Sequence, residues 1–433
     1  MSKQSLRVLF APIDAVGHVN AAIGIAQVLL NAGHEVMFVI NVQWKGRLEP
    51  YGIQEVLIAQ DERSADVDPA KHWADLFISD GLKQWTPLEK LVNIRTKLGP
   101  SFVKKNIDLD KALDDILPNI KPDVIILDQV MCLPSVVLSD IPWILTCSFN
   151  PLSFLNDDRT PPGGSGLPAY ESKNDWKAFR KVVSESQTNM IDKANEFLVA
   201  RGVKSMDTNM AAYLSPYLNI YGFPLELDYL DMRPLPQNWL RFDNFKRYEK
   251  ISKFEIPVEL RDKPGKLIYF SLGSMGGADV QLMKRLTSIL AKSKHRFIVA
   301  KGPNHTEYDL PDNMWGQQSV PQINVLPIVD LVITHGGNNT ITETFYFGKP
   351  MIVMPLFGDQ YDNAQRVHEL GYGKRLDTYN CTEWELLSAI DTIVSDNSLT
   401  EKLKQIAKRI QSDNSLAKLP QIIENLVNNN NNN

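Results

Sequence analysis

The chain has 433 residues, of which 43% are hydrophobic and 22% are charged, and its formal net charge at pH 7 is -5. This length suits two domains better than one compact core, and the composition is that of an ordinary globular protein. A net negative chain lacks the basic face with which proteins bind a phosphate backbone, so we expect no nucleic-acid partner.

Three cysteines, Cys132, Cys147 and Cys381, lie too far apart in the sequence for a metal-binding cluster or a disulfide framework. We expect buried free thiols, which fit a reducing compartment. The N-terminus lacks the pattern of a signal peptide, and no stretch approaches the ~20 apolar residues that span a bilayer. The sequence therefore predicts a soluble, cytoplasmic protein without a membrane anchor.

The first part of the chain alternates strands and helices. Apolar runs at residues 7–11, 35–40, 123–128 and 143–147 predict buried strands, and residues 21–31 predict a helix. A Pro/Gly/Ser-rich loop at 156–168 lies beside a charged helical region at 171–201. Residues 1–240 are therefore predicted to form a Rossmann-like domain, with a parallel sheet between helices.

The same rhythm restarts after a polar, proline-containing stretch at 241–263, which we interpret as an interdomain linker. Apolar runs at 266–272, 296–300, 331–334 and 350–355 predict the strands of a second Rossmann-like domain at 264–410. A C-terminal helix is expected at 411–427, and the asparagine tail at 428–433 is predicted to be disordered. Two facing doubly wound domains would form a ligand cleft where the strands end.

The run from His335 to Thr340 follows the predicted strand at 331–334 and precedes a helix expected from about Ile341. Its two glycines let the backbone approach a ligand, and Asn339 and Thr340 are favourable N-cap residues. The unpaired N–H groups and the positive end of the helix dipole attract phosphate. The alternative is an ordinary tight turn between strand and helix.

Further motifs accompany this run: Pro321-Gln322, Glu343, Gly348-Lys349-Pro350 and the segment from Pro355 to Ala364. Together they resemble the signature of the family 1 UDP-glycosyltransferases, with a spacing similar to that of the bacterial macrolide and antibiotic branch. The resemblance covers nearly the whole chain. It implies an α/β chain of the GT-B fold, with an acceptor-binding first domain and a second domain that binds the UDP-sugar.

By this resemblance, His335 contacts the donor β-phosphate, Asn339 and Thr340 hold the α-phosphate, and Glu343 binds the ribose hydroxyls. Asp359 and Gln360 bind the hexose, and this pair favours UDP-glucose. The turn Ser271-Leu272-Gly273-Ser274 is similar to the family's SxGS turn. The other donor-binding positions are Gly17, Gly273, Ser274, Val320, Gln322, Gly337 and Asn338. Ser319 replaces the tryptophan that stacks on uracil in the family, and Trp315 is the candidate substitute.

Inverting sugar transfer needs a base that removes the proton of the acceptor hydroxyl, and histidine suits this role. His18 follows the first strand, and Asp128 ends the strand at 123–128. We predict that His18 is the base and that Asp128 orients it, as the resemblance implies, although Asp123 and Asp140 flank the same region. The alternative for His18 is a structural hydrogen bond.

No metal and no further cofactor are predicted. The strings Asp66-Val67-Asp68 and Asp108-Leu109-Asp110 match a metal-binding DxD pattern, but the pattern is unspecific and the second string has helical spacing.

Acceptor loops are expected at 72–85, with Trp73, Phe77 and Trp85, and at 149–155. By family analogy the acceptor is a flavonoid, phenol or macrolide, which allows a role in xenobiotic detoxification, and the protein is expected to be a monomer. The alternatives are a UDP-sugar 2-epimerase and a non-catalytic UDP-sugar-binding protein.

Overall fold

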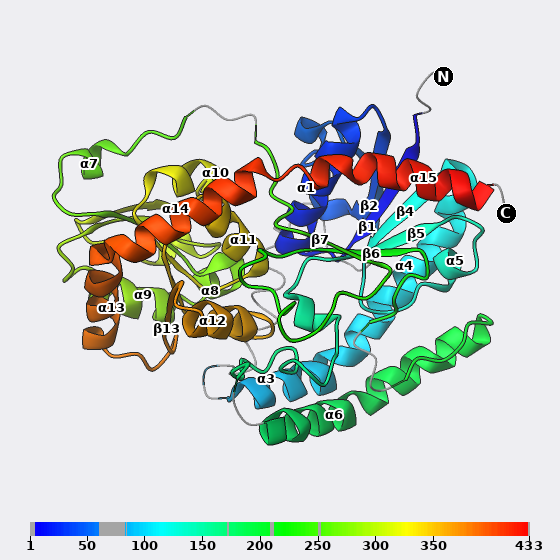
Figure 1. The fold of residues 1–433 in the computed structure, drawn as a ribbon, viewed down its shortest axis with the longest axis horizontal. Coiled ribbons are helices and arrows are strands. Elements are labelled where there is room, and N and C mark those ends of the chain that lie inside the picture. The colour runs from blue at the N-terminus through cyan, green and yellow to red at the C-terminus, as the bar shows by residue number, and fades with distance from the viewer. Residues whose placement is uncertain are drawn as a thin grey trace.

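The computed structural model describes residues 5–59, 83, 85–170, 173–207, 212–249 and 253–431. The chain forms two α/β domains that lie side by side (Figure 1). Each domain is built on one sheet, and every pairing between neighbouring strands is parallel. The predicted fold class is confirmed.

The first sheet has the order β3-β2-β1-β4-β5-β6-β7. Its strands are β1 (Arg7–Pro12), β2 (Glu35–Asn41), β3 (Gln54–Ile58), β4 (Val124–Asp128), β5 (Trp143–Cys147), β6 (Leu218–Gly222) and β7 (Trp239–Phe242). Its helices are α1 (Val16–Asn31), α3 (Pro87–Asn93), α4 (Gly99–Ile120), α5 (Pro134–Val137) and α6 (Lys173–Ala200). A π-helical segment, η4 (Ile94–Leu98), joins α3 to α4. Short 3-10 turns are η1 (Val42–Trp44), η2 (Glu49–Tyr51) and η5 (Pro151–Ser153).

The second sheet has the order β10-β9-β8-β11-β12-β13. Its strands are β8 (Leu267–Ser271), β9 (Arg296–Ala300), β10 (Met314–Gln317), β11 (Leu331–Thr334), β12 (Met351–Val353) and β13 (Gly373–Arg375). Its helices are α7 (Val258–Arg261), α8 (Gly273–Ala278), α9 (Val280–Leu290), α10 (Gln322–Val325), α11 (Asn338–Tyr346), α12 (Gln360–Glu369), α13 (Glu383–Ser395) and α14 (Asn397–Ser412). The remaining 3-10 turns are η6 (His305–Glu307), η7 (Leu326–Ile328) and η8 (Leu416–Lys418), and α15 (Leu419–Asn431) ends the described chain.

The strand order of both sheets reverses at one point, between β1 and β4 in the first domain and between β8 and β11 in the second. Helices leave in opposite directions at such a switch point, so a crevice opens beyond the carboxyl ends of the two strands. The register pairs Pro12 with Asp128 and Ser271 with Thr334, which are the last residues of these strands. The segments that follow them therefore start at the crevice.

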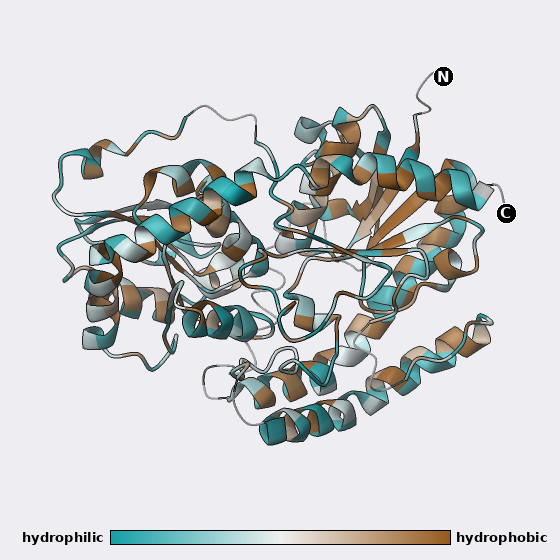
Figure 2. Cartoon of the chain, in the orientation of Figure 1, coloured by the Kyte–Doolittle hydropathy of each residue, from teal (hydrophilic) through white to brown (hydrophobic). Residues whose placement is uncertain are grey.

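The strands next to each switch point are almost completely buried, and the helices cover them with their apolar faces (Figure 2). This explains why the short apolar runs predicted these strands correctly. Several other strands, β3, β6, β7, β10 and β13, were not predicted. Because β7 runs to Phe242, the first two residues of the predicted linker belong to this strand.

The C-terminal segment differs from the expectation of a disordered asparagine tail. α14 packs in the second domain, whereas α15 lies on the first domain beside α1 (Figure 1). Leu419, Ile423 and Val427 recur at helical spacing and are buried there. The helix continues from this packed face through Asn431, and Asn430 donates its side-chain amide to the carbonyl of Asp140 at 3.0 Å.

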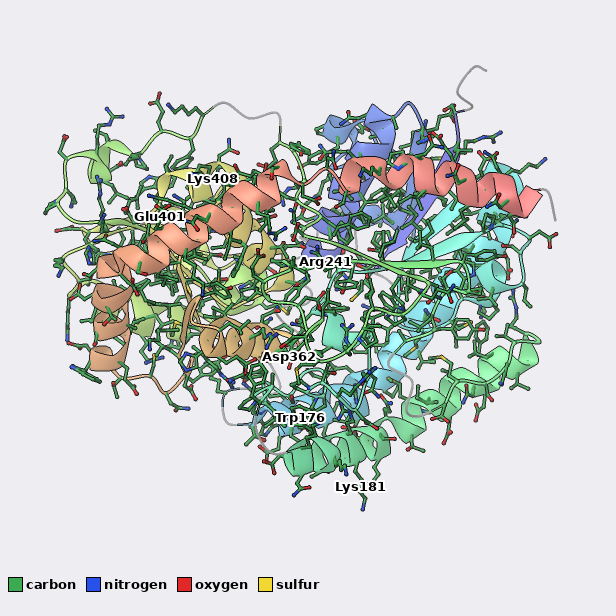
Figure 3. All side chains as sticks on the ribbon, in the orientation of Figure 1. Trp176, Lys181, Arg241, Asp362, Glu401 and Lys408 are labelled. Carbon is green, nitrogen blue, oxygen red and sulfur yellow. The ribbon has the colours of Figure 1, made fainter. Side chains whose placement is uncertain are left out.

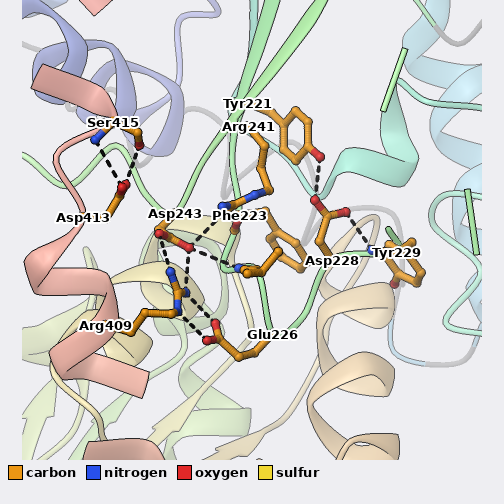
Figure 4. A network of polar contacts seen from close by, with 11 residues as sticks. Tyr221, Phe223, Glu226, Asp228, Tyr229, Arg241, Asp243, Arg409, Asp413 and Ser415 are labelled. Carbon is orange, nitrogen blue, oxygen red and sulfur yellow. Dashed lines mark hydrogen bonds and ion pairs between the residues drawn. The ribbon is translucent and has the colours of Figure 1, made fainter. Parts of the chain in front are cut away.

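Polar contacts join the two domains. Arg409 of α14 forms ion pairs with Glu226 at 2.6 Å and with Asp243 at 2.8 Å, and both acids belong to the chain around β6 and β7 (Figure 4). Asp362 lies at the junction of the domains (Figure 3), where its carboxylate accepts the backbone N–H groups of Gly164 at 2.6 Å and Gly166 at 2.9 Å. The structure therefore holds the two domains together in one closed arrangement.

Membrane spans and metal clusters are both absent from the described residues. None of the helices in that part of the chain combines the length and apolarity needed to cross a membrane. The same residues contain no group of three or more His, Cys, Asp or Glu side chains arranged to hold a metal ion. Asp108 and Asp110 lie within α4, as the helical spacing predicted, and Asp66 and Asp68 fall outside the described residues.

Candidate active site

A cavity of about 2000 Å³ lies between the domains, at the crevice that both switch points define. Residues of both domains line it. They include His18 and every predicted donor-binding position, namely Gly17, Gly273, Ser274, Val320, Gln322, His335, Gly337, Asn338, Asn339, Thr340, Glu343, Asp359 and Gln360. The fold therefore brings these separate sequence motifs together around one space.

His18 lies in the first turn of α1, which begins at Val16 and not at the predicted Ala21. Its Nδ1 atom is 2.7 Å from Oδ2 of Asp128, the last residue of β4. Asp123 is not its partner, because that carboxylate accepts the backbone N–H of Arg7. With Nδ1 bonded to a buried carboxylate, Nε2 is the ring nitrogen that can accept a proton.

Ser148 completes this arrangement and was not predicted. Its hydroxyl donates to Oδ2 of Asp128 at 2.6 Å, and its oxygen is 2.7 Å from Nδ1 of His18. The ring of Phe149 packs edge-on against the imidazole of His18, with the ring centroids 4.5 Å apart. Ser148 directly follows β5, and position at a strand end was the one sequence signal that could have indicated it.

The run from His335 to Thr340, which the sequence predicts to bind phosphate, differs in detail from that prediction. α11 begins at Asn338 and not near Ile341, and Gly337 is its N-cap residue. Asn339 and Thr340 therefore lie within the first turn, where their backbone N–H groups belong to the helix end that attracts anions. The side chain of Asn338 donates to the carbonyl of Gly222 at 3.2 Å and so connects the two domains.

His335 is placed between two glycines. A Cβ atom on Gly273 would lie 2.6 Å from Cε1 of His335, and one on Gly337 would lie 2.7 Å from its Nε2. Burial lowers the pKa of His335 from 6.5 to about 4, so the ring is neutral at pH 7. A neutral imidazole can still donate one N–H to a phosphate oxygen.

Glu343 lies in a dense polar cluster at one end of the cavity. Gln322 donates its side-chain amide to Oε2 of Glu343 at 2.5 Å and accepts from the hydroxyl of Tyr269 at 3.3 Å. Arg247 Nη1 is 3.6 Å from Oε1 of Glu343. Burial raises the pKa of Glu343, and the charge of Arg247 opposes this change. Sequence reasoning missed Arg247, which lies in the predicted linker.

Asp359 and Gln360 follow β12 and also line the cavity. Asp359 accepts the backbone N–H of Asn150 at 2.9 Å, and burial raises its pKa to about 6. The side-chain oxygen of Gln360 accepts the backbone N–H groups of Leu356 and Phe357 at 2.9 and 3.3 Å. This contact orients the side chain and leaves its NH₂ group as a donor for a ligand.

The position of the missing tryptophan is occupied by Ser319, which lines the cavity together with Gln318 and Val320. Trp315 lies earlier, in β10, and packs against Phe254 with the ring centroids 6.0 Å apart. Because Trp315 is not one of the described residues that line the cavity, it does not replace the stacking platform.

The other part of the cavity belongs to the first domain, and we call it the acceptor lobe. Its walls are the cavity-facing sides of α3, η4, α4 and α6 together with the segment 149–155, and they are mainly apolar, with Leu91, Ile94, Phe102, Phe154, Phe179 and Met190 among them. The predicted loop at 149–155 therefore does reach the cavity. Most of the predicted loop at 72–85, including Trp73 and Phe77, lies outside the described residues, and Trp85 contacts Lys97.

The proteins that this chain resembles are sugar transferases. Residues 261–421 match the family model of UDP-glucoronosyl and UDP-glucosyl transferases. A sterol 3-beta-glucosyltransferase of Komagataella phaffii is 24% identical over 96% of this chain and 34% of its own length. The NDP-glycosyltransferase YjiC of Bacillus subtilis is 24% identical over 92% of both chains. The chain spans about a third of the length of the sterol glucosyltransferases that it matches.

Two solved structures are similar over nearly the whole chain. The glycotransferase of kitacinnamycin superposes with a TM-score of 0.70 and 18% sequence identity, and the match covers 98% of this chain and 100% of that protein. The calicheamicin glycosyltransferase CalG4 superposes with a TM-score of 0.68 and 18% identity, and the match covers 98% of this chain and 99% of CalG4. The chain therefore has the GT-B fold of these proteins. Its resemblance to the family 1 UDP-glycosyltransferases is confirmed, and its second domain carries their family signature.

Proposed function

We propose that the enzyme transfers glucose from UDP-glucose to a hydroxyl group of a small lipophilic acceptor, with inversion at the anomeric carbon. The pairing of His18 with Asp128 at the edge of the shared cavity carries this proposal. In the first step Nε2 of His18 removes the hydroxyl proton, and the acceptor oxygen attacks the anomeric carbon while the bond to UDP breaks. Asp128 stabilises the imidazolium that forms.

UDP leaves with developing negative charge on its β-phosphate. The N-terminus of α11, the N–H of His335 and the turn that contains Ser274 supply donors on the donor side of the cavity. Such fixed donors stabilise a leaving phosphate electrostatically. Glu343 would hold the ribose hydroxyls, and Asp359 with Gln360 would hold those of the hexose.

The acceptor lobe supports a lipophilic acceptor because most of its wall is apolar. The sterol glucosyltransferases among the relatives are named for such an acceptor. A flat hydroxylated compound, such as a flavonoid, a phenol or a sterol, would place its hydroxyl near His18 and its body against α4 and α6.

The test is UDP release together with product mass, measured with several UDP-sugars and a panel of phenols, flavonols and sterols. The wild type should release UDP and form a hexose product from UDP-glucose only when an acceptor is present. Both His18→Ala and Asp128→Asn should lower the rate of this transfer by about 100-fold or more. An isomerised sugar without acceptor would indicate an epimerase. UDP binding without any reaction would indicate a binding protein.

A further inference from the structure

The acceptor lobe contains several guanidinium groups within its apolar wall, and two of them are already matched by protein groups. Arg159 pairs with Asp157 at 2.6 Å. Arg180 donates to the carbonyls of Asp157 and Thr160 at 2.8 and 2.7 Å. Two others, Arg95 and Arg233, also line the cavity, and neither has a carboxylate within hydrogen-bond distance among the described residues.

Arg95 lies in the π-helical segment η4 and faces α6. Its one hydrogen bond to a described residue is long, with Nη1 3.4 Å from the carbonyl oxygen of Val183. No carboxylate of the described residues forms an ion pair with it. Burial lowers the pKa of its guanidinium from 12.5 to about 10, which reflects a charge removed from water without a compensating anion.

Arg233 follows β6 and is buried, with 2% of its surface exposed. None of its three side-chain nitrogens has a hydrogen-bond partner among the described residues. Its nearest carboxylate is Asp228 at 3.7 Å, which is beyond hydrogen-bond distance. The carboxylate of Asp228 also accepts the hydroxyl of Tyr221 and the N–H of Tyr229, so both of its oxygens already have closer donors than Arg233.

A buried charge without a hydrogen-bonded counter-ion is unfavourable, and a guanidinium is satisfied best by a planar carboxylate that it can bind through two N–H groups. We propose that the natural acceptor is an amphipathic organic acid, whose carboxylate is bound by Arg95 or Arg233 in the acceptor lobe while its hydroxyl faces His18. This inference rests on the proposed function, and it narrows the acceptor from any lipophilic alcohol to a hydroxylated carboxylic acid.

The test compares matched pairs of acceptors, each a hydroxylated carboxylic acid and its methyl ester. Three scaffolds serve: a 3-hydroxysteroid with a side-chain carboxylate, a hydroxy fatty acid and a phenolic acid. With UDP-glucose, kcat/KM for the acid should exceed that for the ester by about tenfold or more on at least one scaffold. This ratio should fall toward one in Arg95→Gln or Arg233→Gln and should partly persist in Arg95→Lys, which retains the charge.

Lys181→Gln is the control, because it also removes one positive charge, but from the solvent side of α6, where the side chain points away from the molecule (Figure 3). It should leave the ratio unchanged. Calorimetric binding of the acid and the ester, without donor, separates this inference from the proposed function. Tighter binding of the acid that depends on Arg95 or Arg233 would support the inference even if no sugar were transferred. Equal binding of acid and ester on all scaffolds, or no binding of either, would overturn it.

Discussion

Asn339, in the first turn of α11, donates its side-chain amide to the backbone carbonyl of Gly17 across the cleft, at 2.6 Å. Gly17 immediately precedes His18, so a residue of the phosphate-binding run is bonded to the segment that carries the proposed base. This contact connects the N-terminal turn of α11 in the second domain to that of α1 in the first.

We predict that Asn339→Ala will lower kcat and raise the KM for UDP-glucose, so that kcat/KM falls about tenfold or more, because the variant loses both a donor contact and this cross-domain bond. The free energy of unfolding should change by less than about 1 kcal/mol, since the side chain is only partly buried. Steady-state kinetics and urea unfolding provide the two measurements. Asn119→Ala is the control, because this exposed side chain on α4 has, among the described residues, a single hydrogen bond, to the carbonyl of Asp115.

Ser148→Ala should lower kcat by roughly tenfold with a smaller effect on the KM of either substrate. The hydroxyl donates to the Asp128 oxygen that also holds His18, and hydrogen bonds to charged groups contribute about 1.5–3 kcal/mol. The alanine variant leaves the donor loops untouched, so UDP affinity measured by calorimetry should be that of the wild type. A wild-type kcat in Ser148→Ala would exclude a positioning role for this hydroxyl.

Most of the site residues that the sequence indicated lie at or follow the carboxyl ends of strands: β1, β4, β8 and β11 at the switch points, and β10 and β12 beside them. Their position follows from parallel-sheet topology, in which the carboxyl ends of neighbouring strands share one edge. His18 and Asp128 could be paired from the sequence alone, because His18 follows β1, Asp128 ends β4, and these two strands are neighbours in the sheet.

Residues whose role depends on the other domain could not be predicted. Asn150 meets Asp359 only because the domains close on each other, and Arg247 reaches Glu343 from a segment without a recognisable pattern. Short strands such as β13 carry too few residues for a periodic signal. The asparagine run was misjudged because composition alone ignores the packed helix that leads into it.

Gly273→Ala should weaken UDP binding much more than it destabilises the fold. Gly273 has a φ of 69°, and an added methyl group would approach the ring of His335 to 2.6 Å. Gly371 has a similar φ of 70° but open space around its Cα, so Gly371→Ala isolates the conformational penalty, which is about 1 kcal/mol. Calorimetry should show a UDP Kd that is at least about tenfold weaker for Gly273→Ala alone. Equal Kd values for the two variants would argue against the clash with His335.

The depressed pKa of His335 predicts a specific acid sensitivity of the ligand-free enzyme. Between pH 6.5 and about pH 4 the unfolded chain binds a proton at this histidine that the folded chain does not bind, so the unfolding free energy falls as the pH falls through that window. Above pH 6.5 both states are neutral and the contribution vanishes. From pH 7 to pH 5 the wild type should therefore lose about 1–2 kcal/mol more stability than His335→Asn. Urea unfolding of both proteins at the two pH values, without UDP, measures this difference.

Arg247→Gln is expected to make uridine nucleotide binding both weaker and dependent on pH. Burial already raises the pKa of Glu343, and the charge of Arg247 is the largest influence that opposes it. Without that charge the pKa of Glu343 rises further, and a larger fraction of the carboxyl group is protonated at a given pH. A protonated carboxyl group has lost one of the two acceptor positions that the ribose hydroxyls need.

The UDP Kd of Arg247→Gln should therefore exceed that of the wild type, by about tenfold at the acidic end of the titration, and the gap should narrow as the pH rises. Calorimetric titrations of UDP between pH 6 and pH 8 measure both effects. Arg261→Gln, which removes an exposed arginine of α7, controls for the change in net charge. If Arg247 instead contacted the base or a phosphate directly, the loss of affinity would be the same at every pH, because neither contact depends on the protonation of Glu343.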